Sequence, residues 1–320
     1  MYKQFDRQTP VAYTITITLF GVFCWKFFAG NNYVIDAPGH VFLDWVFSNS
    51  NNLLVSKIIS IFLYLFSLIN IYSLFQNKDS SIQNSILAIF LLIVQSIFVL
   101  SFSCTTSDFL VMFYLTMLGK QMQYANHLNV TANHFFTVGL GFGVFLILTP
   151  ALLIFILMII FVINIFGKNG FRDLFAFLLG FVIPVYIWIT SLYLMGDLTA
   201  LHNYQQSLTN FRTQLPSSTQ TILLSIGILH GILAQSFIAN FNISTRKNFS
   251  MYSIILFLLI LFNSGLIFGF SKLFLPLLTI SSLFFMIFLK GIRNEKMKDF
   301  IILFGIVWAI FNTFIKDSFI

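Results

Sequence analysis

Long apolar stretches recur from one end of this chain to the other, and they restrict its fold more than any other feature of the sequence. A helix needs about 20 mainly apolar residues to cross the roughly 30 Å hydrocarbon layer of a membrane. Of the 320 residues, 58% are hydrophobic and 8% are charged, whereas soluble globular chains carry about 25% charged residues. No stretch between the apolar runs is long enough to build a separate soluble core. The sequence therefore predicts an all-α integral membrane protein in which residues 1–320 form a single transmembrane domain.

Polar breaks between the apolar runs divide the chain into eleven predicted transmembrane spans. These spans cover approximately residues 11–29, 53–75, 82–103, 108–122, 134–148, 151–167, 174–196, 220–239, 250–270, 273–290 and 300–315. The first run is too long for the core of a signal peptide and has no cleavage pattern of small residues behind it. We therefore interpret it as a retained span.

The count of eleven depends on the region around Pro150, where two short apolar runs meet without a polar loop. A proline can instead kink one long helix, which would leave ten spans and place both termini on one side. A continuous helix over residues 134–167 would be about 51 Å long, well beyond one bilayer crossing. We therefore favour a tight hairpin at Pro150, with the kinked helix as the alternative.

The distribution of Lys and Arg predicts the orientation, because these residues are retained on the cytoplasmic side during insertion. With a cytoplasmic N-terminus, twelve of the 17 basic residues lie inside: Lys3, Arg7, Lys78, Lys120, Lys168, Arg172, Arg246, Lys247, Lys290, Arg293, Lys296 and Lys298. The external set is Lys26, Lys57, Arg212, Lys272 and Lys316. Lys26 and Lys57 lie close enough to the ends of their spans to extend outward to the membrane surface.

Several classes of function are disfavoured by the sequence. The net charge of +7 does not indicate a nucleic-acid partner, because the basic residues are scattered singly between apolar segments. The two cysteines, Cys24 and Cys104, have no C-x-x-C spacing, and we predict neither a metal site nor a cofactor. No Asp, Glu, Lys or Arg lies at the centre of a predicted span, which argues against a proton pump or a voltage sensor.

The predicted external loops carry most of the candidate site residues. For catalysis, the candidates are Asp36, Asp44, Asp197 and His202. For substrate binding, the external candidates are Arg212, His40 and Asp108. Carboxylates and imidazoles can act as general bases, and a guanidinium group binds phosphate oxygens in a bidentate manner. The alternative is that these are ordinary solvated loop residues, because a site requires that they lie close together.

His230 is the deepest titratable residue in the predicted spans and completes the set of candidate substrate-binding residues. An imidazole at this depth could bind a proton or a substrate. The alternative is a neutral ring that forms a hydrogen bond to a neighbouring helix.

Two spans carry small residues at helical spacing. Gly139 and Gly143 lie four residues apart, with Gly141 between them, and this spacing predicts a smooth stripe along a helix that packs closely against a neighbour. Gly180 and Pro184 are likewise four residues apart and predict close packing and a bend in their own helix.

Three segments carry a family resemblance: the polar start ending in Thr9 and Pro10, the apolar hairpin through Pro150, and GFRDLFAFLLGFVIPVYIWITSLYLMGDL from Gly170 to Leu198. In these segments the chain resembles a family of uncharacterised multi-pass inner-membrane proteins of Gram-negative bacteria, often mislabelled as beta-carotene monooxygenases. The resemblance implies a membrane helical bundle and brings no established activity. The monooxygenase label would imply an iron site built from several histidines, and the five histidines here are too widely spread for one.

A looser similarity concerns the first external loop, where Val41, Asp44 and Trp45 have the spacing of a short helix lying along the membrane surface. An acidic first loop of this kind is similar to that of GT-C glycosyltransferases and of O-antigen polymerases and ligases. Those enzymes usually show a clearer acidic motif or several external arginines, whereas Arg212 is the only arginine in the predicted external loops of this chain.

These observations lead to three hypotheses of function. The first is a bacterial inner-membrane protein that handles a lipid-linked or amphipathic envelope precursor at its external face. The second is a non-catalytic scaffold or partner subunit of an envelope complex, which would tolerate every external polar substitution. The third is a transporter or flippase, for which an inverted repeat between the two halves would be expected, and we find no convincing repeat.

Overall fold

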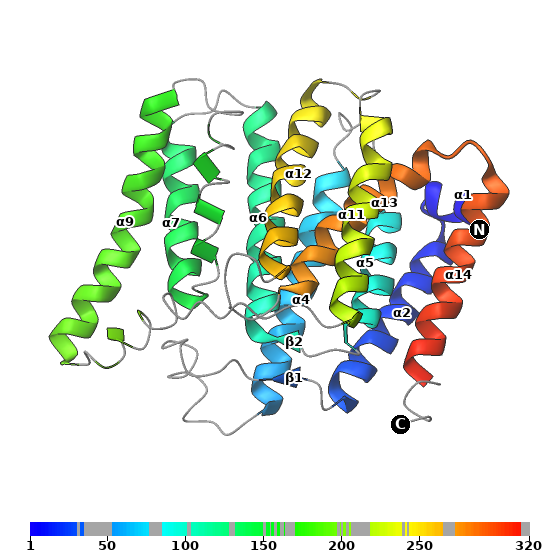
Figure 1. Cartoon of the computed structure of the whole chain (residues 1–320), viewed down its shortest axis with the longest axis horizontal. Helices are drawn as coiled ribbons and strands as arrows, with labels where there is room; N and C mark the ends of the chain where they lie inside the picture. Colours follow the sequence, from blue (N-terminus) through cyan, green and yellow to red (C-terminus); the bar gives the residue numbers. More distant parts are fainter. Residues whose placement is uncertain are drawn as a thin grey trace.

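The helices of this chain stand side by side with their axes roughly aligned, as Figure 1 shows for a computed structural model of the protein. The structure describes residues 1–30, 33–34, 53–76, 85–100, 104–127, 132–149, 170–196, 218–238, 243–264 and 273–314, with shorter pieces at 152–153, 155–156, 159–160, 163, 199, 201–202, 205 and 241. The predicted all-α class is confirmed, because these residues are helical apart from turns and one pair of two-residue strands.

The helices have the following bounds: α1 Tyr2–Asp6, α2 Pro10–Ala29, α4 Leu53–Gln76, α5 Ser85–Val99, α6 Thr106–His127, α7 Ala132–Leu148, α9 Gly170–Met195, α11 Ser218–Ile238, α12 Ile243–Asn263, α13 Phe274–Gly291 and α14 Glu295–Phe314. The two strands are β1 Tyr33–Val34 and β2 Cys104–Thr105. Every helix except α1 overlaps one predicted span.

Five of the helices are long and apolar enough to cross a membrane: Pro10–Ala29, Leu53–Phe75, Gly170–Met195, Thr221–Ile238 and Phe274–Gly291. Three further apolar helical segments, Ser85–Val99, Ala132–Leu148 and Phe249–Asn263, are shorter. This is the composition expected for helices that face lipid, because exposed helices of soluble proteins carry a polar stripe.

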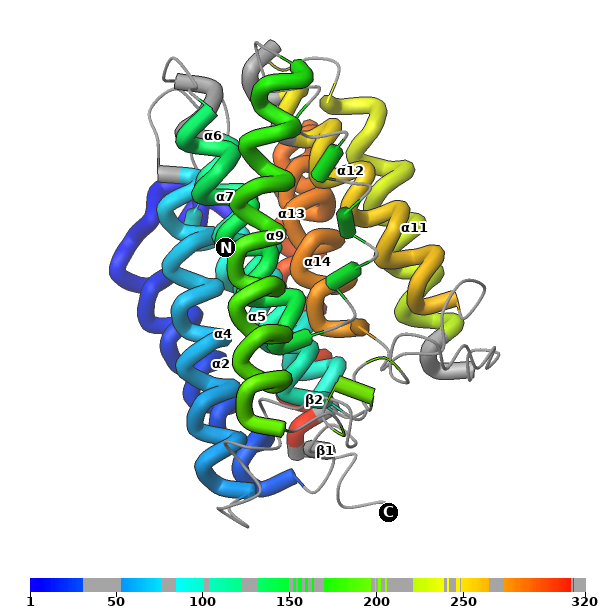
Figure 2. Tube along the Cα trace, turned by 90° about the vertical axis from the view of Figure 1, so that its left-hand side faces the viewer, coloured from blue at the N-terminus to red at the C-terminus, as the bar shows by residue number. Residues whose placement is uncertain are grey.

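Burial differs greatly between the helices and shows where the core lies. In the most apolar part of α13, 78% of the residues are buried, because α5, α6, α11 and α12 pack around it. In α9 the corresponding fraction is 11%, and α9 stands at one edge of the bundle (Figures 1 and 2). The core therefore surrounds α13, while α9 presents large apolar side chains such as Tyr186, Leu194 and Met195 to its surroundings.

Several helices extend beyond the apolar runs that predicted them. The predicted span 108–122 is part of α6, which runs from Thr106 to His127. Likewise, α12 begins at Ile243 and includes the charged pair Arg246 and Lys247, and α14 begins at Glu295. Hydropathy locates the part of a helix that suits lipid, whereas backbone hydrogen bonding continues into polar sequence until a cap ends it.

The contacts between α7 and α9 show how these two helices run relative to each other. Gly139 of α7 lies against Phe177 of α9, and Gly143 lies against Phe181 and Pro184. The residue numbers of the contacting pairs thus increase in the same direction along both helices. The two helices are therefore parallel. Pro150 and most of the chain between these helices lie outside the described residues, and the hairpin at Pro150 stays a prediction.

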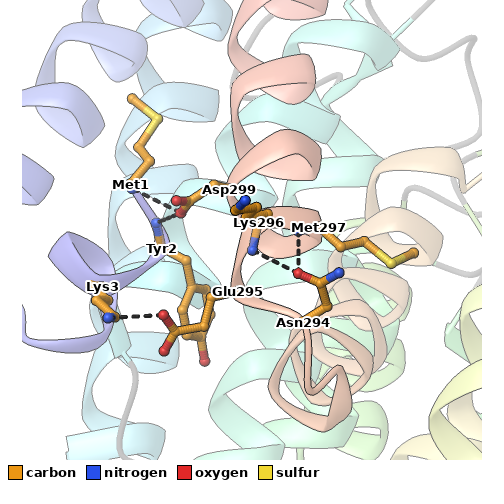
Figure 3. Close-up of polar contacts among 8 residues, drawn as sticks. All are labelled: Met1, Tyr2, Lys3, Asn294, Glu295, Lys296, Met297 and Asp299. Carbon is orange, nitrogen blue, oxygen red and sulfur yellow. Dashed lines mark hydrogen bonds and ion pairs between the residues drawn. The ribbon is translucent and has the colours of Figure 1, made fainter.

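Helix α1, which the sequence analysis did not predict, connects the start of the chain to the first turns of α14 (Figure 3). The Lys3 ammonium lies 2.8 Å from the Glu295 carboxylate, and the N-terminal ammonium lies 2.8 Å from Asp299. The Lys298 Nζ atom lies 4.3 Å from the centre of the Tyr2 ring. Burial raises the pKa of Tyr2 to about 12, with a smaller contribution from the Asp6 carboxylate.

This contact is expected to loosen at low pH. The hydrogen bond from the N-terminal ammonium group lowers the pKa of Asp299. A carboxyl group whose pKa is lower in the folded state stabilises that state above its unfolded pKa of about 3.9, and the contribution is lost as the pH falls through the folded value. The distance between spin labels at Gln4 and Met297 should therefore stay narrow at pH 7 and broaden below about pH 4.

Asp299→Asn should give the broad distribution already at pH 7. Glu295→Gln is the matched control, because it removes the other ion pair of α1 and leaves the Asp299 carboxylate in place. The role assigned to Asp299 is wrong if D299N keeps the narrow distribution at both pH values.

Candidate functional site

The end of the bundle that carries β1 and β2 also holds a group of buried polar side chains. Strand β1 pairs in parallel with β2, with Tyr33 opposite Cys104 and Val34 opposite Thr105. This pair attaches the chain that leaves α2 to the start of α6.

Asp108 closes a capping box at the start of α6. Its backbone N–H donates to the Thr105 hydroxyl at 3.3 Å, while its carboxylate accepts from the Thr105 N–H at 3.0 Å and from the Thr105 hydroxyl at 3.2 Å. The reciprocal pair satisfies backbone donors that a helix start otherwise leaves without partners. The Asp108 side chain is buried, with 2% of its surface exposed. The structure therefore gives this predicted substrate-binding residue a definite local role in ordering α6.

Lys57 lies in the second turn of α4 and points inward. Its Nζ atom donates to the carbonyl of Phe28 at 3.1 Å and to that of Gly30 at 2.9 Å, at the carboxyl end of α2. Carbonyls at this end of a helix lack partners within the helix, and the helix dipole favours a positive charge there. Lys57 is 5% exposed, and Lys26 of α2 is 7% exposed. Both side chains are therefore covered by neighbouring parts of the protein.

Small hydroxyl side chains connect α4 to α6 at the same end. The Ser56 and Thr106 hydroxyls are 3.1 Å apart, and both residues are buried, as is Ser107. We refer to the set Lys26, Ser56, Lys57, Thr106, Ser107 and Asp108 as the strand-end cluster. It combines two ammonium groups, one carboxylate and three hydroxyls within helix ends that are otherwise apolar. Ammonium and hydroxyl donors are the groups that bind phosphate or carboxylate oxygens.

The other predicted site residues fall into two groups. Asp36, His40, Asp44, Asp197 and Arg212 lie outside the described residues. His202 is described and lies exposed in a short helical piece, and His230 lies in the middle of α11. Since Asp108 lies in the first turn of α6, the structure does not bring His230 to the strand-end cluster.

His230 is held by an aromatic contact. Its ring stacks on Phe285 of α13 with 4.3 Å between the ring centroids and 19° between the planes, and the side chain is 8% exposed. This position favours a structural role between α11 and α13. In the part of the chain that the structure describes, no group of three His, Cys, Asp or Glu side chains is placed to hold a metal ion.

The sequence contains signals for the strand-end cluster that did not lead to a prediction of Lys26, Lys57 and Ser56 as site residues. Ser56, Ser60, Tyr64 and Ser67 recur at intervals of three or four residues, and all four are completely buried. Such spacing places polar groups on one face of a helix. Lys26 and Lys57 lie near those ends of consecutive predicted spans that face the same side.

Comparison of the chain with protein-family models, with curated proteins and with solved structures gives no match in any of the three.

Proposed function

We propose that this chain is an integral protein of the bacterial inner membrane that binds the anionic part of a lipid-linked or amphipathic envelope precursor at its external face. The five helices that are long and apolar enough to span a bilayer support membrane insertion. The excess of Lys and Arg in the alternate loops supports a cytoplasmic N-terminus. In this orientation the strand-end cluster lies at the external face, and the family resemblance described above agrees with an inner-membrane location.

The observation that carries the proposal is the burial of Lys57 at that end of the bundle. Removing a charged group from water costs several kcal/mol unless partners compensate it. The two carbonyls that accept hydrogen bonds from Lys57 are neutral dipoles, and an opposite charge stabilises an ammonium group more than a neutral dipole does. An anionic headgroup would supply such a charge. A phosphate is the common anion of lipid-linked precursors, and an attached apolar chain would lie beside the helices.

Binding of a long-chain prenyl phosphate to the full-length protein in phosphatidylcholine nanodiscs tests the proposal. The phosphate should raise the unfolding temperature of the wild type, because a ligand that binds the native state stabilises it. The prenyl alcohol of equal chain length should not. Lys57→Gln should lose most of the shift, because glutamine keeps N–H donors for the α2 carbonyls but carries no charge.

Lys298→Gln is the matched control. Lys298 is also a buried lysine, and its Nζ atom also donates to a carbonyl near a helix end, that of Lys290 at 3.5 Å, but it lies at the opposite end of the bundle. We expect this variant to keep the full shift. An unchanged shift in K57Q, or an equal shift with the alcohol, would overturn the phosphate site and leave the scaffold and transporter hypotheses.

A further inference from the structure

An apolar groove runs along the outside of the bundle between α2 and α4. Both helices pack against α5 but make few contacts with each other, so α5 forms the floor of the groove. The groove has a volume of about 280 Å³, and its two walls include Tyr13, Ile17 and Phe20 of α2 and Leu65, Ile69 and Tyr72 of α4. The hydroxyl of Thr16, which also faces the groove, donates to the Ala12 carbonyl at 2.8 Å and is thus satisfied within its own helix.

Aromatic rings close one end of this α2–α4 groove. Tyr64 stacks on Phe23 with 4.3 Å between the ring centroids and on Phe20 with 6.3 Å. These rings fill the space between α2 and α4 in the half of the bundle nearer to the strand-end cluster. In the other half, aliphatic side chains such as Ile17 and Ile69 line the gap between the two helices, and it stays open. The groove therefore ends at Phe20 and does not cross the whole bundle.

The open end carries the only two phenol groups among the residues that line the groove. They belong to Tyr13, near the start of α2, and Tyr72, near the end of α4. Tyrosine prefers the boundary between hydrocarbon and headgroups, where its ring is apolar and its hydroxyl is wet. From Tyr13 to Phe20 the groove is about 10 Å long. The hydrocarbon layer is roughly 30 Å thick, so each leaflet contributes about 15 Å, and the groove covers most of that depth.

We infer that the α2–α4 groove binds one acyl chain of a membrane lipid from the leaflet on the N-terminal side. The inference rests on membrane insertion, which is part of the proposed function, but not on the phosphate site, which lies at the other end of the bundle. The volume lies just below the roughly 300 Å³ at which the usual range of ligand sites begins, which suits a single chain rather than a helix about 10–12 Å wide with its side chains. The aromatic closure fixes its direction, with the methyl end at Phe20 and the carboxyl end at Tyr13.

Photocrosslinking tests both the occupant and its direction. The full-length protein is reconstituted in phosphatidylcholine vesicles that contain phosphatidylcholine with a diazirine either near the carboxyl end or near the methyl end of one acyl chain. Peptide mapping by mass spectrometry should place the first label around Tyr13 and Tyr72, and the second around Phe20 and Leu65. The reversed order, or labels spread evenly over all exposed helix faces, would overturn the inference.

Ile69→Trp and Ile58→Trp form a matched pair. Both isoleucines are exposed on α4, but only Ile69 lines the groove. A tryptophan at position 69 should fill the groove and reduce labelling of α2 several-fold, whereas I58W should label like the wild type. If I69W fails to fold, the positions of the two labels in the wild type still decide the question. A protein outside the membrane would take up no label at all, so failure of insertion is distinguishable from an empty groove.

Discussion

Gly180→Ala is expected to separate α9 from α7. A Cβ atom at position 180 would lie 2.2 Å from the carbonyl oxygen of Phe136 and 3.0 Å from the backbone nitrogen of Leu140. Backbone atoms cannot rotate away as a side chain can, so the helices must move apart. Overpacking of this kind costs about 1–3 kcal/mol or more. Among the described helices α9 packs mainly against α7, and we therefore expect local detachment rather than global unfolding.

Hydrogen exchange of the full-length protein in nanodiscs measures this separation. Amide protection should fall in α9 and in the facing part of α7, and it should stay unchanged in α13. Gly141→Ala is the control, because a Cβ atom there would meet nothing within 4 Å. Alanine is a better helix former than glycine by up to about 1 kcal/mol, so G141A should be neutral or slightly more stable. Equal protection patterns in G180A and G141A would contradict the prediction.

This pair of helices also shows what the sequence can and cannot predict about packing. The four-residue spacing of Gly139 and Gly143, and the same spacing of Gly180 and Pro184, correctly predicted two closely packing helix faces. It did not predict that the faces meet each other. Spacing reports only the surface of one helix, and its partner depends on how the whole chain is arranged.

Helix boundaries were predictable only where the helix and its apolar run end at the same residues. The predicted span 273–290 agrees with α13 to within one residue at each end. In contrast, α14 starts five residues before its predicted span, where the Asn294 side chain accepts hydrogen bonds from the backbone N–H groups of Lys296 and Met297 (Figure 3). A capping side chain ends a helix through hydrogen bonds, and these do not appear in a hydropathy profile.

The candidate site was less predictable than the fold. Asp108 was recognised because an acidic residue at the edge of a span is conspicuous, yet its capping box with Thr105 has a three-residue spacing that the sequence already contains. The contacts of Lys57 were not predicted, because its partners are the carbonyls of Phe28 and Gly30, which lie 29 and 27 residues away in the chain. A lysine near a span end extends outward by default, and only the folded arrangement shows that carbonyl groups lie within its reach.

Tyr64→Ala is expected to be the most destabilising single change considered for this protein. The side chain is completely buried, its ring stacks on Phe23 at 4.3 Å, and it meets Phe109 edge-on at 6.2 Å. Removing a large buried side chain leaves a cavity that the neighbours fill only partly, and such changes cost about 3–5 kcal/mol. Thermal unfolding of the purified protein should show a large decrease in stability. Tyr64→Phe, which keeps the ring, should cost about 1 kcal/mol or less.

The same substitution tests why the α2–α4 groove ends where it does. If the Tyr64 ring closes the groove, its removal in Y64A should let an acyl chain reach further along α2. The methyl-end photolabel should then move beyond Phe20 toward Phe27, while in Tyr64→Phe it should stay at Phe20. A label that stays at Phe20 in Y64A would assign the closure to Phe23 rather than to Tyr64. The position of this label in the two variants therefore measures which ring closes the groove.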